Sequence, residues 1–406
     1  MPLRMFKLGA LVAALLGLAM PASAAKPGGV YAIVDASAPA QDAVTAAALA
    51  TPGVDGLLIH LRWNDISPSR TTYDWASLDR VLKLVTASNP VKRFEIGIVT
   101  GAAQPSWITD PVSSGGLGAA HATFDIAAAG KCTTFTMAAP WDHAYLTAFR
   151  DLLHQLAQHL RSKQVYGRLS MLKLDGLTTT TDELRLPAVQ SCSGAAADPV
   201  KTWHTLGYKP DLVEGAWKAM LRSFLDHFPD KAFNIGFIGV NAFPGIDADG
   251  SIAPTSDAKT ISARFTAKLI ADAGAAMPGR LALGFDSLTL NIPPSDRSYG
   301  QSIAEYFSDI AAAGARPGWQ VNELLGNYPA GGASCGGNTQ TNAVPCKGPD
   351  EFRLMLFRGV YPNGKANTPP AQQGVYMEVF PQNVCVTLAT CTDLRSVHRH
   401  LAPWNG

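Results

Sequence analysis

Short apolar segments alternate with amphipathic stretches along most of the chain. Eight of the apolar segments have the length and continuous apolar character of buried parallel strands, about five to eight residues. They are Val30–Val34, Gly56–Leu61, Phe94–Val99, Leu169–Leu174, Phe233–Gly239, Leu281–Phe285, Trp319–Asn322 and Gly374–Val379.

Apolar residues recur at helical spacing between these strands. In 141–160, for example, Leu146, Phe149 and Leu153 lie on one stripe of a helix. The predicted helices are Tyr73–Ala87, Trp141–Leu160, Leu212–His227, Ala258–Ala273, Ser302–Ala313, Glu351–Phe357 and Asp393–His400. Eight strand–helix units predict an α/β fold with a parallel sheet inside and helices outside. The eightfold count favours a closed (β/α)8 TIM barrel. No G-x-G-x-x-G follows the first strand and no P-loop motif occurs, which disfavours an open nucleotide-binding sheet.

Four long insertions each follow a predicted strand. They span 101–140, 176–210, 241–257 and 326–350. In a barrel the loops that follow strands build the active-site face. We therefore expect this face to recognise a ligand of some size.

The first 25 residues have the pattern of a secretory signal peptide. Arg4 and Lys7 precede an apolar run, which ends before the small residues at 22–25. We expect residues 1–25 to be removed, leaving 26–406 as one barrel domain that is secreted or periplasmic and holds no membrane segment. The 33 basic and 32 acidic residues give a net charge of +1. This balance gives no reason to expect nucleic acid as a partner.

Six cysteines in an exported chain favour disulfide bonds. Short spacings suggest the pairs Cys335–Cys346 and Cys385–Cys391, which leaves Cys132 with Cys192. Fifteen pairings are possible for six cysteines, so this pairing is a preference. No C-x-x-C motif occurs and no histidine has ligand spacing beside the cysteines, so zinc is not expected.

Two glutamates follow predicted strands where a barrel collects its catalytic groups. Glu183 lies after the fourth strand and Glu323 lies at the end of the seventh. Hydrolysis of a glycosidic bond uses two carboxyl groups that flank the bond. The chain resembles the superfamily of retaining (β/α)8 glycoside hydrolases, of the β-galactosidase and cellulase type. That resemblance implies Glu183 as acid/base and Glu323 as nucleophile.

Other segments agree with the resemblance. The stretch from His60 to Pro68, followed by Tyr73-Asp74-Trp75, resembles the second strand and following helix of these enzymes. By position, Arg62 matches the arginine that steadies the nucleophile. Trp63 and Trp107 are candidates for stacking on a sugar. His60 is assigned to solvent or to structure.

Two positions depart from the superfamily pattern. Asp182 precedes Glu183 where the superfamily usually has an asparagine that bonds the sugar 2-hydroxyl, and the last strand offers Glu378 where a tryptophan is common. We assign Asp182, Asn322 and Glu378 to substrate binding. Asp175 and Asp286, also at strand ends, remain open between site and scaffold.

The sequence thus predicts a retaining glycosidase that acts on an oligo- or polysaccharide and needs no metal or organic cofactor. One alternative is a barrel that binds a glycan without cleaving it. Another is an inverting hydrolase that pairs Glu378 with Glu183.

Overall fold

The computed structural model describes residues 28–88, 92–128, 131–189, 192, 198–237, 241–288, 314–321, 349–361 and 373–401. The predicted signal peptide, the predicted helix Ser302–Ala313 and the predicted pair Cys335–Cys346 lie outside these residues.

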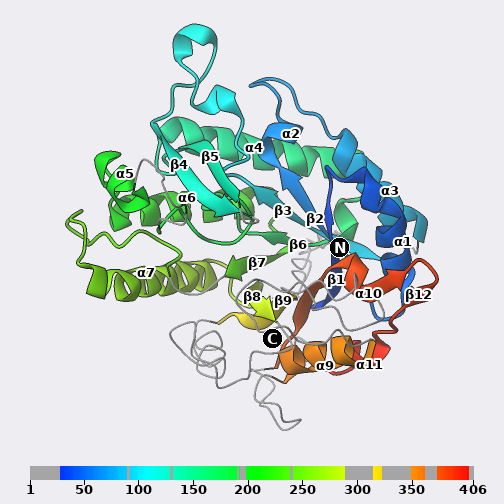
Figure 1. Cartoon of the computed structure of the whole chain (residues 1–406). Coiled ribbons are helices and arrows are strands. Elements are labelled where there is room, and N and C mark those ends of the chain that lie inside the picture. Colours follow the sequence, from blue (N-terminus) through cyan, green and yellow to red (C-terminus); the bar gives the residue numbers. More distant parts are fainter. Residues whose placement is uncertain are drawn as a thin grey trace, which may run out of the picture.

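Eight parallel strands close into a barrel in the order β1-β2-β3-β6-β7-β8-β9-β10, and β10 pairs with β1 (Figure 1). The barrel strands are β1 (Gly29–Asp35), β2 (Gly56–Arg62), β3 (Arg93–Val99), β6 (Leu169–Lys173), β7 (Ala232–Phe237), β8 (Leu281–Leu288), β9 (Arg316–Val321) and β10 (Tyr376–Val379). The predicted TIM barrel is confirmed. Strand β9 begins three residues earlier than the predicted Trp319, because Arg316 already pairs with Ala282 of β8.

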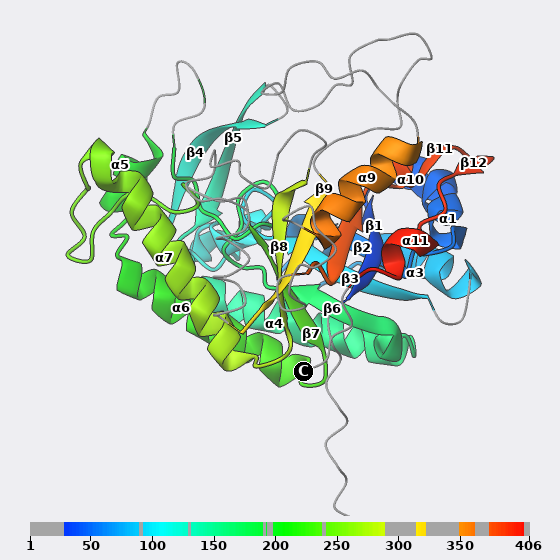
Figure 2. The ribbon, with the colours of Figure 1, turned by 90° about the horizontal axis from the view of Figure 1, so that it is seen from below.

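Helices surround the barrel, as Figures 1 and 2 show. They are α1 (Asp42–Ala50), α3 (Ala76–Ser88), α4 (His143–Ser162), α6 (Pro210–His227), α7 (Thr255–Ala276), α9 (Pro349–Val360) and α11 (Arg395–His398). Most of them follow a barrel strand, and their buried apolar residues share one core with the outward residues of the strands. In α4 these buried residues include Phe149, Leu153 and Leu156. Asp142 begins this helix by accepting a bond from the Ala144 amide.

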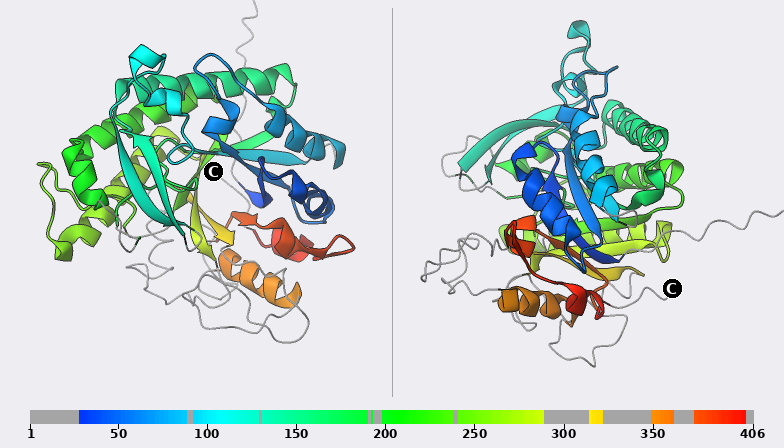
Figure 3. Two further views of the ribbon diagram at one scale, coloured as in Figure 1. Left: turned by 45° about the horizontal axis from the view of Figure 1, so that its top comes forward. Right: turned by 90° about the vertical axis from the view of Figure 1, so that its right-hand side faces the viewer.

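A β-hairpin occupies the long loop after β3. Its strands are β4 (His121–Ala128) and β5 (Lys131–Ala138), and it projects beside α5 (Pro199–Thr205) (Figure 3). Phe124 packs on Trp203 of α5 with ring centroids 4.7 Å apart. A disulfide joins Cys132 of the hairpin to Cys192 in the loop after β6, which confirms one predicted pair.

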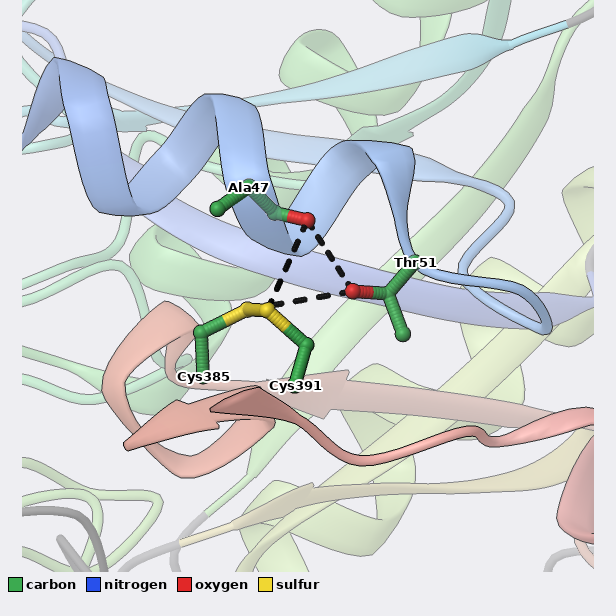
Figure 4. Close-up of a disulfide and its surroundings, with 4 residues drawn as sticks. All are labelled: Ala47, Thr51, Cys385 and Cys391. Atoms are coloured by element: carbon green, nitrogen blue, oxygen red, sulfur yellow. Dashed lines mark hydrogen bonds between the residues drawn. A yellow bond between two sulfur atoms is a disulfide. The ribbon is translucent and has the colours of Figure 1, made fainter. Parts of the chain in front are cut away.

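A second disulfide, between Cys385 and Cys391, confirms another predicted pair. It closes a small loop after α10 (Pro381–Val384), formed by β11 (Cys385–Thr387) and β12 (Thr390–Cys391). Figure 4 shows this disulfide against the end of α1. Cys385 Sγ lies 3.7 Å from the hydroxyl of Thr51, and Cys391 Sγ lies 4.0 Å from the carbonyl oxygen of Ala47.

No helix within the described ranges is long and apolar enough to cross a membrane.

Candidate active site

Alternate residues of each barrel strand point into the barrel, and their character changes along the strands. Near the N-terminal end the inward side chains form a small apolar cluster, which includes Leu58, Met171 and Ala282. Toward the C-terminal end the inward positions are polar or are glycines. The polar ones include His60, Lys173, Asn234, Asp286, Gln320 and Glu378. The C-terminal end of a barrel is where active sites form.

Lys173, the last residue of β6, lies at the centre of this polar layer. Its Nζ atom lies 3.0 Å from Asp182 Oδ2 and 2.9 Å from Glu378 Oε2. It also donates to Gln320 Oε1 at 3.3 Å. The side chain is buried. Burial alone would lower the pKa of Lys173, but the Asp182 and Glu378 carboxylates raise it well above its usual value, so the ammonium stays charged.

Glu378 accepts hydrogen bonds on both of its oxygens. Besides the bond from Lys173, Asn234 Nδ2 donates to Oε1 at 2.9 Å and the Tyr376 hydroxyl lies 2.6 Å from the same atom. Glu378 is buried. Because protein donors already occupy both oxygens, this geometry favours a role in holding the site over direct contact with a substrate.

The Tyr376 hydroxyl lies between two carboxyl groups, since it also contacts Glu95 Oε2. The Tyr376 hydroxyl has one hydrogen to donate, so it can donate to only one of the two carboxyl groups. A hydrogen bond with the other carboxyl requires that carboxyl to be protonated. Burial and the charge of Glu378 raise the pKa of Glu95 well above its usual value. The raised pKa favours Glu95 as the carboxyl that carries this proton.

Glu183 lies in a loop that turns back over the barrel mouth after β6. The Leu184 amide donates to the Gly236 carbonyl of β7 at 2.9 Å, and the Leu186 amide donates to the Ala242 carbonyl at 2.8 Å. Glu183 itself forms a parallel bridge with Gly236. These bonds extend the sheet by a few residues and fix the backbone at Glu183.

Glu183 is 2% exposed, and its carboxyl has two neighbours from its own loop. The Thr181 hydroxyl donates to Glu183 Oε2, and Arg185 Nη2 lies 3.4 Å from the same oxygen. Arg185 also donates to Thr181 Oγ1 at 2.5 Å. The guanidinium thus supports the carboxyl both directly and through the threonine.

Two glycines leave room for this loop. A Cβ atom on Gly97 of β3 would lie 2.6 Å from Asp182 Oδ2, and one on Gly236 would lie 3.3 Å from Glu183 Cα. The absence of a side chain at Gly97 and Gly236 therefore leaves space for Asp182 and Glu183 at the barrel mouth.

Further carboxyl groups lie close to the loop. Burial and the nearby Glu183 carboxyl raise the pKa of Asp286 well above its usual value. Asp175 accepts the Ile98 amide at 2.6 Å. Burial and the charge of Asp182 raise the pKa of Asp175. We infer that Asp286 belongs to the site and that Asp175 ties β3 to the start of the loop.

Strand β2 contributes His60 to the cluster. Its Nε2 atom lies 3.0 Å from Asp182 Oδ2. Assigned from the sequence to solvent or to structure, His60 lies in this polar cluster and pairs with Asp182. Arg62, two residues later, has an exposed side chain 3.7 Å from Asp35 Oδ2. Its predicted partner, Glu323, lies outside the described residues together with Asn322. The predicted roles of Arg62, Glu323 and Asn322 stay predictions.

The two tryptophans differ in exposure. Trp63 is fully buried and packs edge-on against Trp107, Tyr145 and Phe149. Its assignment to sugar stacking is wrong, because none of its surface is open to a ligand. Trp107 is half-buried and donates through Nε1 to the Ser67 carbonyl at 3.0 Å. Trp107 remains a candidate for a sugar-stacking wall.

Among the described residues, no cluster of three or more His, Cys, Asp and Glu side chains has a geometry that could hold a metal ion. The arrangement offers acid–base and electrostatic chemistry through Glu183, Asp182 and Asp286.

Comparison with known proteins agrees with the fold. No protein-family model matches the sequence, and no curated protein matches it. Among solved structures, the catalytic domain of β-amylase from Paenibacillus polymyxa is similar to 93% of this chain and 99% of that domain, with a TM-score of 0.55 and 12% identity.

Two larger enzymes show a weaker likeness. β-Galactosidase from the psychrophilic Marinomonas ef1 matches 87% of this chain with a TM-score of 0.48 and 11% identity. Exo-β-1,4-mannosidase from Opitutaceae bacterium strain TAV5 matches 87% with a TM-score of 0.43 and 12% identity. The chain spans 54% and 52% of their respective lengths. At such low identity, what the comparison with the β-amylase domain shows is the (β/α)8-barrel architecture.

Proposed function

We propose that the chain is a glycoside hydrolase that cleaves an oligo- or polysaccharide by double displacement. The observation that carries the proposal is the Glu183 carboxyl. It follows the fourth barrel strand, on the face where barrel enzymes hold their sites, and Thr181, Arg185 and Asp286 surround it.

In this proposal Glu183 donates a proton to the leaving glycosidic oxygen and later removes one from the attacking water. Glu323 attacks the anomeric carbon. In the sequence Glu323 stands two residues after Val321, the last described residue of β9, which supports its assignment to the seventh barrel strand. Double displacement requires the two carboxyl groups to be about 5–5.5 Å apart.

The substrate of the proposed enzyme is a carbohydrate, which fits the long loops after the barrel strands. Trp107 is the side chain proposed to form one wall for a sugar ring. The Asp182 carboxylate forms ion pairs with His60 and Lys173 at the same barrel mouth. A carboxylate held in this way is suited to bond a sugar hydroxyl beside the reacting centre.

We also propose that the chain is exported. The pattern of residues 1–25 supports this, and so do the disulfides Cys132–Cys192 and Cys385–Cys391, because disulfides persist in oxidising compartments.

The proposal is tested with a panel of aryl glycosides and polysaccharides. The wild type should cleave at least one of them, and Glu183→Gln should lose about 10²- to 10⁴-fold in kcat, the usual contribution of a general acid/base. The control is Glu214→Gln, which changes a glutamate of α6 that pairs with Lys218 and Lys268. Its kcat should equal that of the wild type.

The stereochemistry of the first-formed product, read by proton NMR, separates the mechanisms. Retention supports double displacement, and inversion contradicts it. Binding of glycans without any cleavage would instead favour the binding-protein alternative.

A further inference from the structure

One buried ammonium group joins three separate parts of the barrel. Lys173 of β6 contacts Asp182 in the following loop, Gln320 of β9 and Glu378 of β10. Strand β6 is the fourth strand around the barrel, and β9 and β10 are the seventh and eighth. The lysine therefore spans the interior from one side of the barrel to the other.

Two of these partners adjoin the proposed catalytic groups. Asp182 directly precedes Glu183, and Gln320 is three residues before Glu323 in the sequence. The same ammonium thus contacts both chain segments that lead to the two carboxyls.

The interior of the barrel is shaped around this contact. A Cβ atom on Gly97 would lie 2.6 Å from Asp182 Oδ2 and 3.3 Å from Lys173 Cδ. The pair occupies space that any larger residue on β3 would fill. The positions of Asp182 and Lys173 are thus fixed by their close approach to Gly97 and by the ion pair between them.

We propose that Lys173 is a positioning residue of the active site, which holds Asp182 against Gln320 of β9 and Glu378 of β10 and thereby fixes the segment that carries Glu183. The inference rests on the proposed glycosidase function. Lys173 acts in this role through the protein, because Asp182, Gln320 and Glu378 already occupy its three N–H donors.

The charge of Asp182 gives the proposal a distinctive readout. Burial alone would raise the pKa of Asp182, but His60 and Lys173 together hold it far below its usual range. Removing Lys173 leaves Asp182 with one cation instead of two. Asp182 should then take up a proton at a higher pH than in the wild type.

The test is Lys173→Met, which keeps the length of the side chain and removes its charge. We expect kcat to fall about 10²-fold, as for a misplacement of about 1 Å, while KM changes less than about threefold. The acidic limb of the kcat/KM profile should move to higher pH. A variant with unchanged kcat and an unchanged pH profile, altered only in stability, would overturn the proposal.

Loss of the shared cation leaves Asp182 and Glu378 buried without it, so Lys173→Met is at risk of not folding. Gly97→Ala tests the same geometry with no change of charge, because its methyl group displaces Asp182 and Lys173. It should lower kcat at least about tenfold, since small displacements of catalytic groups suffice for such losses. Its control is Gly167→Ala, where a Cβ meets nothing within 4 Å. Equal kcat in the two alanine variants would contradict the proposal.

Failure of the proposal and failure of the proposed function give different results. If the wild type cleaves its substrate and Glu183→Gln does not, the function stands and the Lys173 and Gly97 variants alone decide the inference. If the wild type cleaves no glycan on the panel, the proposed function fails and the inference falls with it.

Discussion

The imidazole Nε2 atom of His60 lies 3.0 Å from Asp182 Oδ2, across the mouth of the barrel from β2 to the loop after β6. His60 is 23% exposed and Asp182 is 1% exposed, so the histidine is the side of the pair that meets solvent. Burial alone would lower the pKa of His60, and Lys173 also lowers it. The charges of Asp182 and Glu378 outweigh both effects and raise the pKa above 6.5.

The first prediction concerns pH and stability. A histidine with a raised pKa in the folded state stabilises the fold fully below its unfolded pKa, and this contribution is lost as pH rises through the folded pKa. Asp182 stays ionised throughout, because its pKa is held low. We therefore expect part of the unfolding free energy to decline as pH rises from about 6.5, the ordinary histidine value.

Urea denaturation at pH values from about 5.5 to 9 measures this contribution across the range where histidine titrates. The wild type should lose more stability over this range than His60→Gln does. His204→Gln, at an exposed position on α5, should follow the wild type. Parallel curves for the wild type and His60→Gln would contradict the ion pair.

The barrel could be predicted because its signal is repeated. Each of the eight strands has outward residues that are buried under helices, so each gives an apolar run of its own, and a small error in one run does not change the count. The early start of β9 was missed because Arg316 and Pro317 do not look like strand residues. Their place in the strand comes from pairing with β8.

Part of the site could also be predicted. Acidic residues at strand ends are conspicuous in a barrel, so the sequence singles out Glu183, Asp182 and Glu378, and the structure brings them to the same barrel mouth. Lys173 and Asn234 were missed although a signal was present. Read at every second residue, the strands place their polar side chains on the inward face. The apolar outward residues between them masked this alternation.

Other features depend on contacts that the sequence does not display. Gly97 is required by the position of Asp182, 85 residues away, and the raised pKa of Glu95 follows from its burial and from the charge of Glu378. From its position after the second strand, Trp63 is a candidate for stacking on a sugar, because the sequence does not show that the side chain is buried. Only the packing of α4 against it shows that the ring is covered.

The second prediction tests the two tryptophans. Trp63→Ala should lower the unfolding free energy by about 3–5 kcal/mol, the usual effect of removing a large buried aromatic side chain. The KM of the folded fraction should not change. Trp107→Ala should be less destabilising, because the ring is half-buried, and should raise KM if that ring forms a sugar wall. Chemical denaturation and steady-state kinetics measure both effects. A higher KM for Trp63→Ala with unchanged stability would contradict the packing role.

The third prediction concerns the Tyr376 hydroxyl. Tyr376→Phe leaves Glu95 and Glu378 without the group that links them. Buried polar groups left unsatisfied cost about 1–3 kcal/mol, so the variant should be destabilised by that amount. In Tyr73→Phe the lost hydroxyl donated to Asp151, at an exposed site, and the loss should be below about 1 kcal/mol. Urea midpoints compare the two variants. Equal midpoints would show that the buried link does not contribute.

The fourth prediction ranks the two disulfides by the loops they close. Cys132 and Cys192 are 60 residues apart, whereas Cys385 and Cys391 are 6 apart. If a disulfide acts by restricting the unfolded chain, the longer loop is worth about 4 kcal/mol and the shorter about 2 kcal/mol. Replacing both cysteines of a pair by serine should therefore lower the unfolding free energy more for Cys132–Cys192. The shorter bridge also lies against Thr51 and Ala47 of the α1 end, so its removal takes away native contacts as well.

Should the variant lacking Cys385–Cys391 prove the less stable of the two, these contacts would outweigh loop closure. If reductant leaves the wild-type unfolding curve unchanged and thiol counting finds free cysteines beforehand, the bridges do not form in the isolated protein.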